Sequence, residues 1–222
     1  MQTPVIAPSI LAADFARLGK EIDAVLAAGA EWIHVDIMDN HFVPNLTMGP
    51  QVVKSIRDYG ITVPLDVHLM IEPVADMIVP FAQAGATYIS FHAEAVTDIP
   101  AMIDSIRQHG CQPGIVYNPQ TAIDGLEKFI DQVDLVLIMS VHAGFGGQAF
   151  IPETLDKVRQ VRELIDQGNQ NIRLEIDGGI NHETIQLAAM AGADTFVAGS
   201  AIFKSQDYGE TIRELREQST IA

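Results

Sequence analysis

Residues 28–37 read AGAEWIHVDI, and this stretch decides the fold because it joins the end of a helix to a strand. Gly29 supplies the left-handed residue that stops a helix, and the apolar run after it has the length of a buried strand. The same unit returns at residues 84–92 as AGATYISFH and at residues 191–199 as AGADTFVAG. In each copy, the residue seven positions after the glycine falls at the strand tail, which gives Asp36, His92 and Gly199.

Strand-like runs alternate with amphipathic helical stretches along the whole chain. Strands are predicted at residues 5–9, 32–37, 65–70, 88–92, 112–117, 135–140, 172–177 and 195–198. Helices are predicted between them at residues 15–28, 50–59, 74–84, 100–109, 153–167 and 183–191. This alternation in 222 residues is typical of a (β/α)8 TIM barrel, here one domain over residues 1–222. An open doubly wound sheet is the alternative, and it would require a reversal of strand order.

The composition is that of an acidic globular domain, with 48% hydrophobic residues and a formal net charge of -16. This charge argues against nucleic acid or an anionic membrane as a partner. No apolar run approaches the roughly 18 residues of a membrane span, and the N-terminus lacks the basic region of a signal peptide. Cys111, the single cysteine, suits a reducing compartment, so we expect a cytoplasmic protein.

Four residues of metal-binding type lie at predicted strand tails: His34, Asp36, His68 and Asp177. Side chains on a strand alternate between faces, so His34 and Asp36 point the same way. The carboxyl ends of barrel strands meet at one mouth, where active sites lie. Imidazole combined with carboxylate suits Zn2+, Fe2+, Mn2+ or Co2+ better than Mg2+ or Ca2+. We therefore predict one divalent metal ion there, with two carboxylates beside it.

Two further polar residues lie near these tails. Asp66 lies on the same strand face as His68 and one step deeper, so it is predicted to support a ligand or the core. His92 also ends a strand, and is predicted to be structural or to support a ligand.

Glycine clusters follow the late strands, as Gly144-Phe145-Gly146-Gly147, Gly178-Gly179 and Gly199-Ser200. Backbone N–H groups in such turns bind phosphate, and the loops after strands seven and eight of a barrel are a recurrent site. None of the 13 Lys and Arg residues is expected at a strand tail. We therefore expect backbone amides and helix dipoles to hold most of a bound phosphate. The same absence argues against a Schiff-base aldolase, which needs a lysine in the barrel mouth.

Six motifs carry a family resemblance: APSILAADF, HVDIMDNHFVPNLTMGP, LDVHLMI, SVHAGFGGQAFIP, EIDGGIN and FVAGSAIF. With these, the chain resembles the ribulose-phosphate 3-epimerase family nearly end to end. The resemblance implies a (β/α)8 barrel that interconverts D-ribulose 5-phosphate and D-xylulose 5-phosphate. It implies that the metal is bound by His34, Asp36, His68 and Asp177. It also implies that Asp36 and Asp177 exchange the C3 proton through a metal-stabilised enediolate.

The resemblance implies a small sugar phosphate as the partner and allows a homo-oligomer, which is common in the family. It implies substrate contacts from Ser9, His68, Asp177 and the three glycine clusters. It further implies a dry cap over the reacting carbons, formed by Met38, Met70 and Met139.

The chain departs from the family pattern at two places. Asn40 stands where the family usually has glycine, and His142-Ala143 stands where it usually has Asn-Pro. Asparagine tolerates the left-handed conformation, whereas His142 leaves substrate preference and loop rigidity open. Residues 40–48, which follow Asp36, are a candidate lid.

Three other functions compete with the pentose epimerase. An epimerase for a longer ketose phosphate, such as allulose 6-phosphate, would share the metal site and differ in its contacts with the far end of the sugar, where GFGGQ and DGGIN favour the pentose enzyme. A related decarboxylase or aldol-type lyase carries Asp-x-Lys-x-x-Asp, whereas this chain reads Asp36-Ile37-Met38-Asp39. A non-catalytic sugar-phosphate binding barrel would be expected to lose Asp36 or Asp177, and both are present. These comparisons favour the pentose epimerase.

Overall fold

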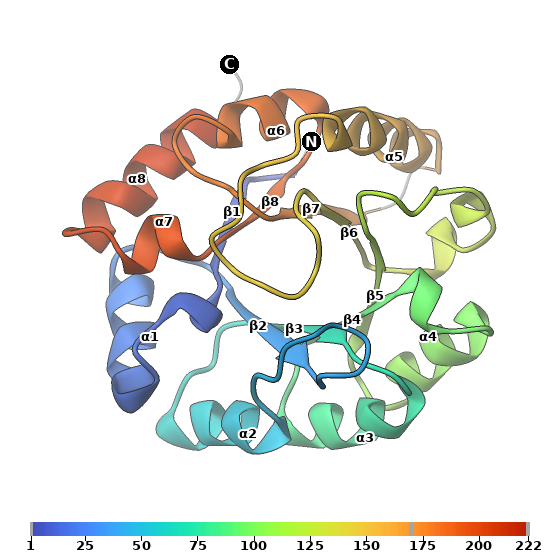
Figure 1. The fold of residues 1–222 in the computed structure, drawn as a ribbon, viewed down its shortest axis with the longest axis horizontal. Coiled ribbons are helices and arrows are strands. Elements are labelled where there is room, and N and C mark those ends of the chain that lie inside the picture. The colour runs from blue at the N-terminus through green and yellow to red at the C-terminus, as the bar shows by residue number, and fades with distance from the viewer. Residues whose placement is uncertain (1, 169–170, 221–222) are drawn as a thin grey trace.

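The computed structural model describes residues 2–168 and 171–220, and its sheet is a ring of parallel strands. The strands are β1 (Val5–Pro8), β2 (Ile33–Met38), β3 (Leu65–Met70), β4 (Tyr88–His92), β5 (Gln112–Tyr117), β6 (Leu135–Met139), β7 (Arg173–Asp177) and β8 (Thr195–Ala198). Their order is β1-β8-β7-β6-β5-β4-β3-β2, and a parallel bridge between Ser9 and His34 closes the ring (Figure 1). The predicted barrel is confirmed. The doubly wound alternative is wrong, because the strand order does not reverse.

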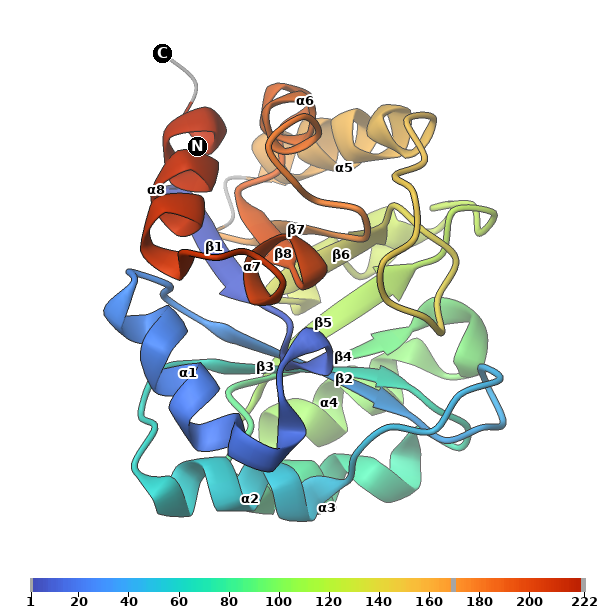
Figure 2. The ribbon, with the colours of Figure 1, turned by 60° about the vertical axis from the view of Figure 1, so that its left-hand side comes forward.

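Helices surround this ring on its outer side (Figures 1 and 2). They are α1 (Leu18–Ala27), α2 (Pro50–Tyr59), α3 (Ala75–Ala84), α4 (Ile99–Gln108), α5 (Thr154–Gly168), α6 (Ile185–Ala191), α7 (Ser200–Phe203) and α8 (Tyr208–Ser219). The β5–β6 connection contains two 3-10 turns instead of an α-helix, at Leu126–Lys128 and Ile130–Gln132. The sequence reading missed α7, which is one turn long, and α8, whose mostly polar sequence buries a narrow stripe around Ile212 and Leu215.

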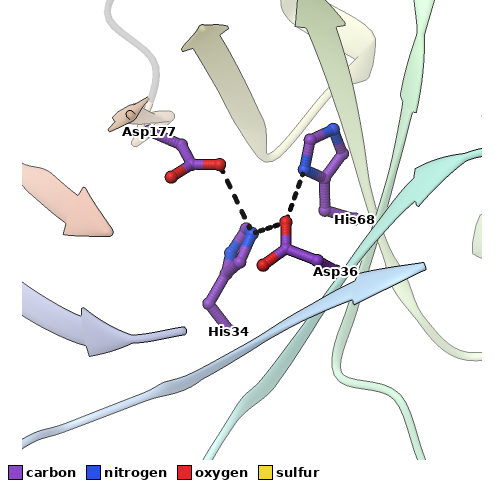
Figure 3. A group of neighbouring side chains, drawn as sticks. All are labelled: His34, Asp36, His68 and Asp177. Carbon is purple, nitrogen blue, oxygen red and sulfur yellow. Dashed lines mark ion pairs between the residues drawn. The ribbon is translucent and has the colours of Figure 1, made fainter. Parts of the chain in front are cut away.

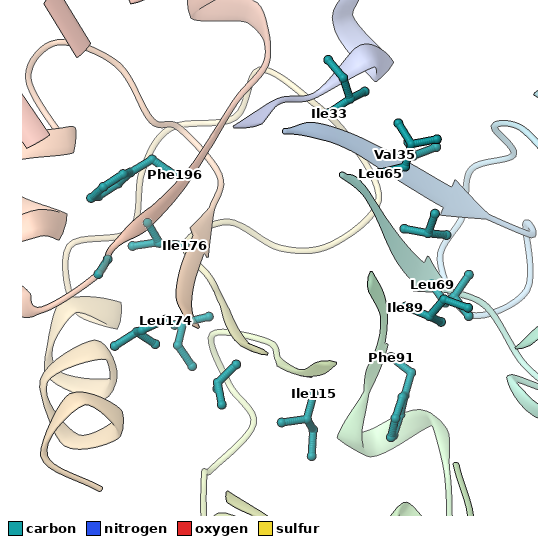
Figure 4. Close-up of a cluster of buried hydrophobic side chains, with 14 of the residues drawn as sticks. Ile33, Val35, Leu65, Leu69, Ile89, Phe91, Ile115, Leu174, Ile176 and Phe196 are labelled. Atoms are coloured by element: carbon teal, nitrogen blue, oxygen red, sulfur yellow. The ribbon is translucent and has the colours of Figure 1, made fainter. Parts of the chain in front are cut away.

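Strand alternation separates an apolar layer from a polar one. In β2, Ile33 and Val35 join the apolar cluster between the strands and helices (Figure 4), whereas His34 and Asp36 face the barrel interior. Residues far apart in the sequence then share one level of the barrel. His34 pairs in register with Asp66, and Asp36 pairs with His68. The fold therefore concentrates imidazoles and carboxylates inside an otherwise apolar domain.

Candidate active site

Four side chains converge at the carboxyl end of the barrel, from β2, β3 and β7 (Figure 3). His34 Nε2 lies 3.3 Å from Asp36 Oδ1 and 3.9 Å from Asp177 Oδ2. His68 Nδ1 lies 3.5 Å from the same Asp36 oxygen. One ligand atom from each of the four residues lies within 4.8 Å of all the others. The structure therefore brings together all four predicted metal ligands.

The two imidazole nitrogens that face this centre test whether a cation fits it. His34 Nε2 and His68 Nδ1 are both buried and have no hydrogen-bond partner among the described residues. Leaving a buried polar atom without a partner costs roughly 1–3 kcal/mol. Two such nitrogens aimed at carboxylate oxygens form a mixed imidazole and carboxylate donor set, which suits a divalent transition metal. The residues thus fit the metal that the resemblance implies.

The opposite edges of these ligands are held by neighbouring polar groups. His34 Nδ1 lies 2.6 Å from Asp66 Oδ2, which is the supporting contact predicted for Asp66. Ser9 Oγ donates a 2.5 Å hydrogen bond to Asp36 Oδ2, so the other Asp36 oxygen faces the imidazoles. These contacts fix the orientation of the ligands before any metal binds.

The sequence reading missed Glu175, a fully buried residue whose Oε1 lies 3.7 Å from His34 Nδ1. The available signal was its position in the apolar run RLEID, two residues before Asp177 and on the same strand face. Glu175 and Asp66 thus form a carboxyl layer beneath the candidate metal centre.

The environment pushes the pKa values of the two aspartates apart. Burial and the negative charge of Asp36 raise the pKa of Asp177 to about 7. Burial also acts to raise the pKa of Asp36, but the adjacent His34 and His68 outweigh it and hold that pKa well below its usual range. Burial lowers the pKa of His68 to about 4, which keeps this imidazole neutral. Two carboxyl groups whose pKa values diverge in this way are suited to opposite roles as acid and base.

A pocket of about 410 Å³ lies over this centre. Among the residues that line it are Ser9, Asp36, Met38, Met70, Met139, Gly144, Phe145, Gly146, Gly147, Asp177, Gly178, Gly179, Gly199 and Ser200. Apart from Asp36, which is predicted as a catalytic residue and metal ligand, these are the predicted substrate contacts; the one missing is His68, which is fully buried and is not among the lining residues. The predicted residues therefore share one cavity, and a substrate contact by His68 stays a prediction.

Lys204 also lines the pocket, so the expectation of a barrel mouth without a cationic side chain is wrong. The residue directly follows the short helix α7, a local turn that the sequence reading did not foresee. The lysine-based argument against Schiff-base chemistry therefore no longer holds by itself. His142 lines the same pocket, and its Nδ1 lies 2.9 Å from Gln120 Nε2.

Gly178 and Gly179 are required by close packing at the end of β7. A Cβ atom on Gly178 would lie 2.5 Å from Val141 Cγ2, and one on Gly179 would lie 2.6 Å from the backbone nitrogen of Phe150. Both glycines have positive φ angles, of 121° and 65°. They let the β6–α5 loop, which crosses the middle of Figure 1, pack onto the end of β7.

The β2–α2 loop contacts the β6–α5 loop across the pocket. Asn45 Nδ2 donates a 2.8 Å hydrogen bond to the carbonyl oxygen of Gly144. Asn40 has a φ of 59°, which confirms that asparagine occupies the left-handed conformation here. The two loops are therefore joined directly, and closure of residues 40–48 as a lid stays a prediction.

This fold and site define a class: a barrel enzyme with a candidate metal centre beneath a glycine-lined pocket. Residues 5–203 match the model of the Ribulose-phosphate 3 epimerase family. The chain belongs to that family, which confirms the resemblance seen in its motifs. Among the described residues, no helix has both the length and the apolar character needed to span a membrane.

Curated relatives carry the same family description. The chain is 56% identical to ribulose-phosphate 3-epimerase of Serratia marcescens over 208 residues, which cover 94% of this chain and 99% of that one. It is 53% identical to the enzyme of the same name from Escherichia coli strain K12 over 218 residues, covering 98% and 97%.

Solved structures at lower identity support the fold alone. The 3-keto-L-gulonate-6-phosphate decarboxylase from Vibrio cholerae aligns over 98% of both chains, with a TM-score of 0.73 and 21% identity. The 3-hexulose-6-phosphate synthase from Salmonella typhimurium aligns over 99% of this chain and 98% of its own, with a TM-score of 0.69 and 18% identity.

Proposed function

We propose that this chain interconverts D-ribulose 5-phosphate and D-xylulose 5-phosphate by inverting the configuration at C3. The observation that carries the proposal is the pair Asp36 and Asp177, which face the same centre from β2 and β7 with divergent pKa values. The relatives that bear the name of this activity, at 53% and 56% identity, support the choice of substrate.

The C3 proton of the substrate is acidic because the adjacent C2 ketone can become an enediolate. Inversion requires one group to remove this proton from one face and another to supply a proton from the opposite face. The reaction must therefore begin with one carboxylate ionised and one carboxyl protonated. In the metal-free protein the pKa of Asp36 is lowered and that of Asp177 is raised to about 7, so Asp177 is the carboxyl group that takes up a proton first. The two residues exchange these states when the reverse reaction runs.

The candidate metal ligands are His34, Asp36, His68 and Asp177. A bound Zn2+, Fe2+, Mn2+ or Co2+ would supply a Lewis acid that stabilises negative charge on the sugar oxygens. Among the pocket residues, Met38, Met70 and Met139 are nearly fully buried. They exclude water from the reacting carbons without offering a competing acid.

The phosphate of the substrate binds among the glycine clusters at the other side of the pocket. Gly146, Gly147, Gly178, Gly179, Gly199 and Ser200 offer backbone N–H groups there. Lys204 adds a positive charge at the same cavity. Phe145 lines the same pocket and is half-exposed.

The remaining properties follow from composition and family. The net charge of -16 makes nucleic acid an unfavourable partner, and the single buried cysteine suits the reducing cytoplasm. The chain functions as one barrel domain, and by analogy with its family, in which oligomers are common, it assembles as a homo-oligomer.

The test compares substrates and metals directly. The protein is stripped with a chelator, reloaded separately with Zn2+, Fe2+, Mn2+ or Co2+, and assayed with ribulose 5-phosphate and allulose 6-phosphate. We expect turnover of the pentose phosphate to return with at least one metal and to exceed turnover of the hexose phosphate. Faster turnover of allulose 6-phosphate would show that the longer sugar phosphate is the preferred substrate. Binding of both sugars without turnover would indicate a non-catalytic barrel.

A further inference from the structure

His92 lies outside the four candidate metal ligands, yet it contacts one of them directly. Its side chain is fully buried, and its Nε2 lies 2.9 Å from His68 Nε2. The two rings stack with centroids 5.0 Å apart and an angle of 26° between their planes. His68 turns its other nitrogen, Nδ1, toward Asp36 at 3.5 Å. One edge of His68 thus faces the candidate metal centre and the opposite edge faces His92.

Hydrogen placement on His68 follows from these contacts. A neutral imidazole carries one N–H, and only the nitrogen without that hydrogen can bind a metal. His68 Nδ1 has no hydrogen-bond partner in the described part of the chain, whereas Nε2 has His92. If His68 binds a metal through Nδ1, its hydrogen lies on Nε2 and is donated to His92 Nε2. His92 must then carry its own hydrogen on Nδ1.

Glu94 is placed to accept that second hydrogen. Its Oε1 lies 3.5 Å from His92 Nδ1 and accepts hydrogen bonds from Asn118 Nδ2 at 2.6 Å and from Thr121 Oγ1 at 2.9 Å. Asn118 Nδ2 also lies 3.2 Å from His92 Nδ1 and can donate to it only when that nitrogen carries no hydrogen, so the tautomer of His92 distinguishes Asn118 from Glu94 as its partner. Hydrogen bonds from His92 and Asn118 outweigh burial and lower the pKa of Glu94 to about 2, so this residue is an ionised acceptor.

The loop that carries these donors is itself anchored. Lys157 Nζ donates to the carbonyl oxygens of Asn118 at 2.7 Å and of Thr121 at 2.6 Å. Phe42 covers His92 on another side, with ring centroids 4.9 Å apart. His92 is therefore contacted by the β2–α2 loop and by the loop after β5, which helix α5 anchors.

We propose that His92 is a positioning residue that, together with Glu94, holds His68 in the tautomer that binds the metal through Nδ1. His34 uses the other ring nitrogen, because its Nδ1 contacts Asp66 and its Nε2 faces the candidate metal centre. The inference rests on the metal-dependent activity proposed above and extends it beyond the four ligands. Partners of this kind typically change metal affinity about 10- to 100-fold when they are removed.

The experiment measures Zn2+ affinity by competition with a chromophoric chelator, in the absence of substrate. His92→Leu removes the acceptor while keeping a similar volume, and we expect the affinity to fall by about 10- to 100-fold. His92→Gln retains an acceptor oxygen and should recover most of the loss. Glu94→Gln should cause a smaller loss. Glu127→Gln removes an exposed charge elsewhere in the β5–β6 connection and serves as the matched control, with unchanged affinity.

A second readout observes the tautomer directly. In 15N-histidine NMR spectra of the metal-free protein, we expect His68 to carry its hydrogen on Nε2 and His92 on Nδ1. Hydrogen on His68 Nδ1, or unchanged Zn2+ affinity in His92→Leu and Glu94→Gln, would overturn the inference. If His92→Leu does not fold, the Zn2+ affinity of Glu94→Gln and the NMR spectra of the unsubstituted protein still test the inference. Since neither readout uses substrate, a failed epimerase assay would remove the proposed function without altering these results.

Discussion

Asp177 should destabilise the metal-free protein, and replacing it with asparagine should therefore raise stability. Burial and the charge of Asp36 raise the pKa of Asp177 from 3.8 to about 7. The fold therefore favours the neutral carboxyl, and the stability that this form provides is present below about pH 4 and lost as the pH rises through 7. At about 1.4 kcal/mol for each pKa unit, ionisation at pH 8 costs the folded state about 4 kcal/mol. An asparagine side chain at this position stays neutral at every pH, so Asp177→Asn avoids this cost.

The assay is urea unfolding in the presence of a chelator, at pH 5 and at pH 8. We expect the free energy of unfolding of Asp177→Asn to be higher than that of the unsubstituted protein, by about 4 kcal/mol at pH 8 and by less than about 2 kcal/mol at pH 5. Asp124→Asn replaces an exposed aspartate and should change the unfolding free energy by less than about 0.5 kcal/mol at either pH. Saturation with Zn2+ should reverse the order, because the variant loses a ligand. An equal difference at both pH values, or a less stable variant at pH 8, would refute the reasoning.

Four further predictions follow from the site. Ser9→Ala removes the 2.5 Å hydrogen bond to Asp36, and a charge-assisted bond worth about 1.5–3 kcal/mol predicts a loss in kcat/KM of about 10- to 100-fold; an unchanged kcat/KM would contradict this. Gly179→Ala forces a Cβ atom to 2.6 Å from the backbone of Phe150 at a φ of 65°, so steady-state kinetics should show a higher KM and thermal melting a lower Tm, whereas unchanged values would show that the loop yields freely. Lys204→Met should raise KM for the sugar phosphate, leave kcat nearly constant and weaken the salt dependence of kcat/KM; a fall in kcat alone would argue against a phosphate contact. Zn2+ competes with protons for Asp177 and for His34, whose pKa is raised by Asp36 and Asp66 despite burial, so Zn2+ affinity should fall by at least about tenfold for each pH unit below about 7; a flat profile in chelator competition between pH 5.5 and 7 would contradict their role as ligands.

The alternation of short apolar runs with amphipathic stretches was sufficient to predict the barrel. All eight predicted strands agree with the structure to within one residue at each end, because buried strands of a parallel sheet form short apolar runs bounded by glycine and polar turns. The connection after β5 was less predictable, since its 3-10 turns are short and lack a sustained amphipathic pattern.

The candidate ligands could be found from their strand tails, but their supporting contacts could not. His34 with Asp66 and His68 with His92 are pairs between different strands, and the sequence does not specify which nitrogen faces which neighbour. Glu175 was hidden because its importance comes from a contact across the ring with β2. Lys204 was misplaced because its direction depends on the single turn of α7. Position along a strand was readable from the sequence, whereas contacts made by closing the ring were not.

The most direct test of the central claim is proton NMR of the metal-loaded protein with ribulose 5-phosphate in D2O. We predict that xylulose 5-phosphate appears with deuterium at C3, and that Asp36→Asn and Asp177→Asn each abolish its formation. Product that retains the original hydrogen at C3, or full activity in either variant, would contradict a two-base epimerase built on these aspartates.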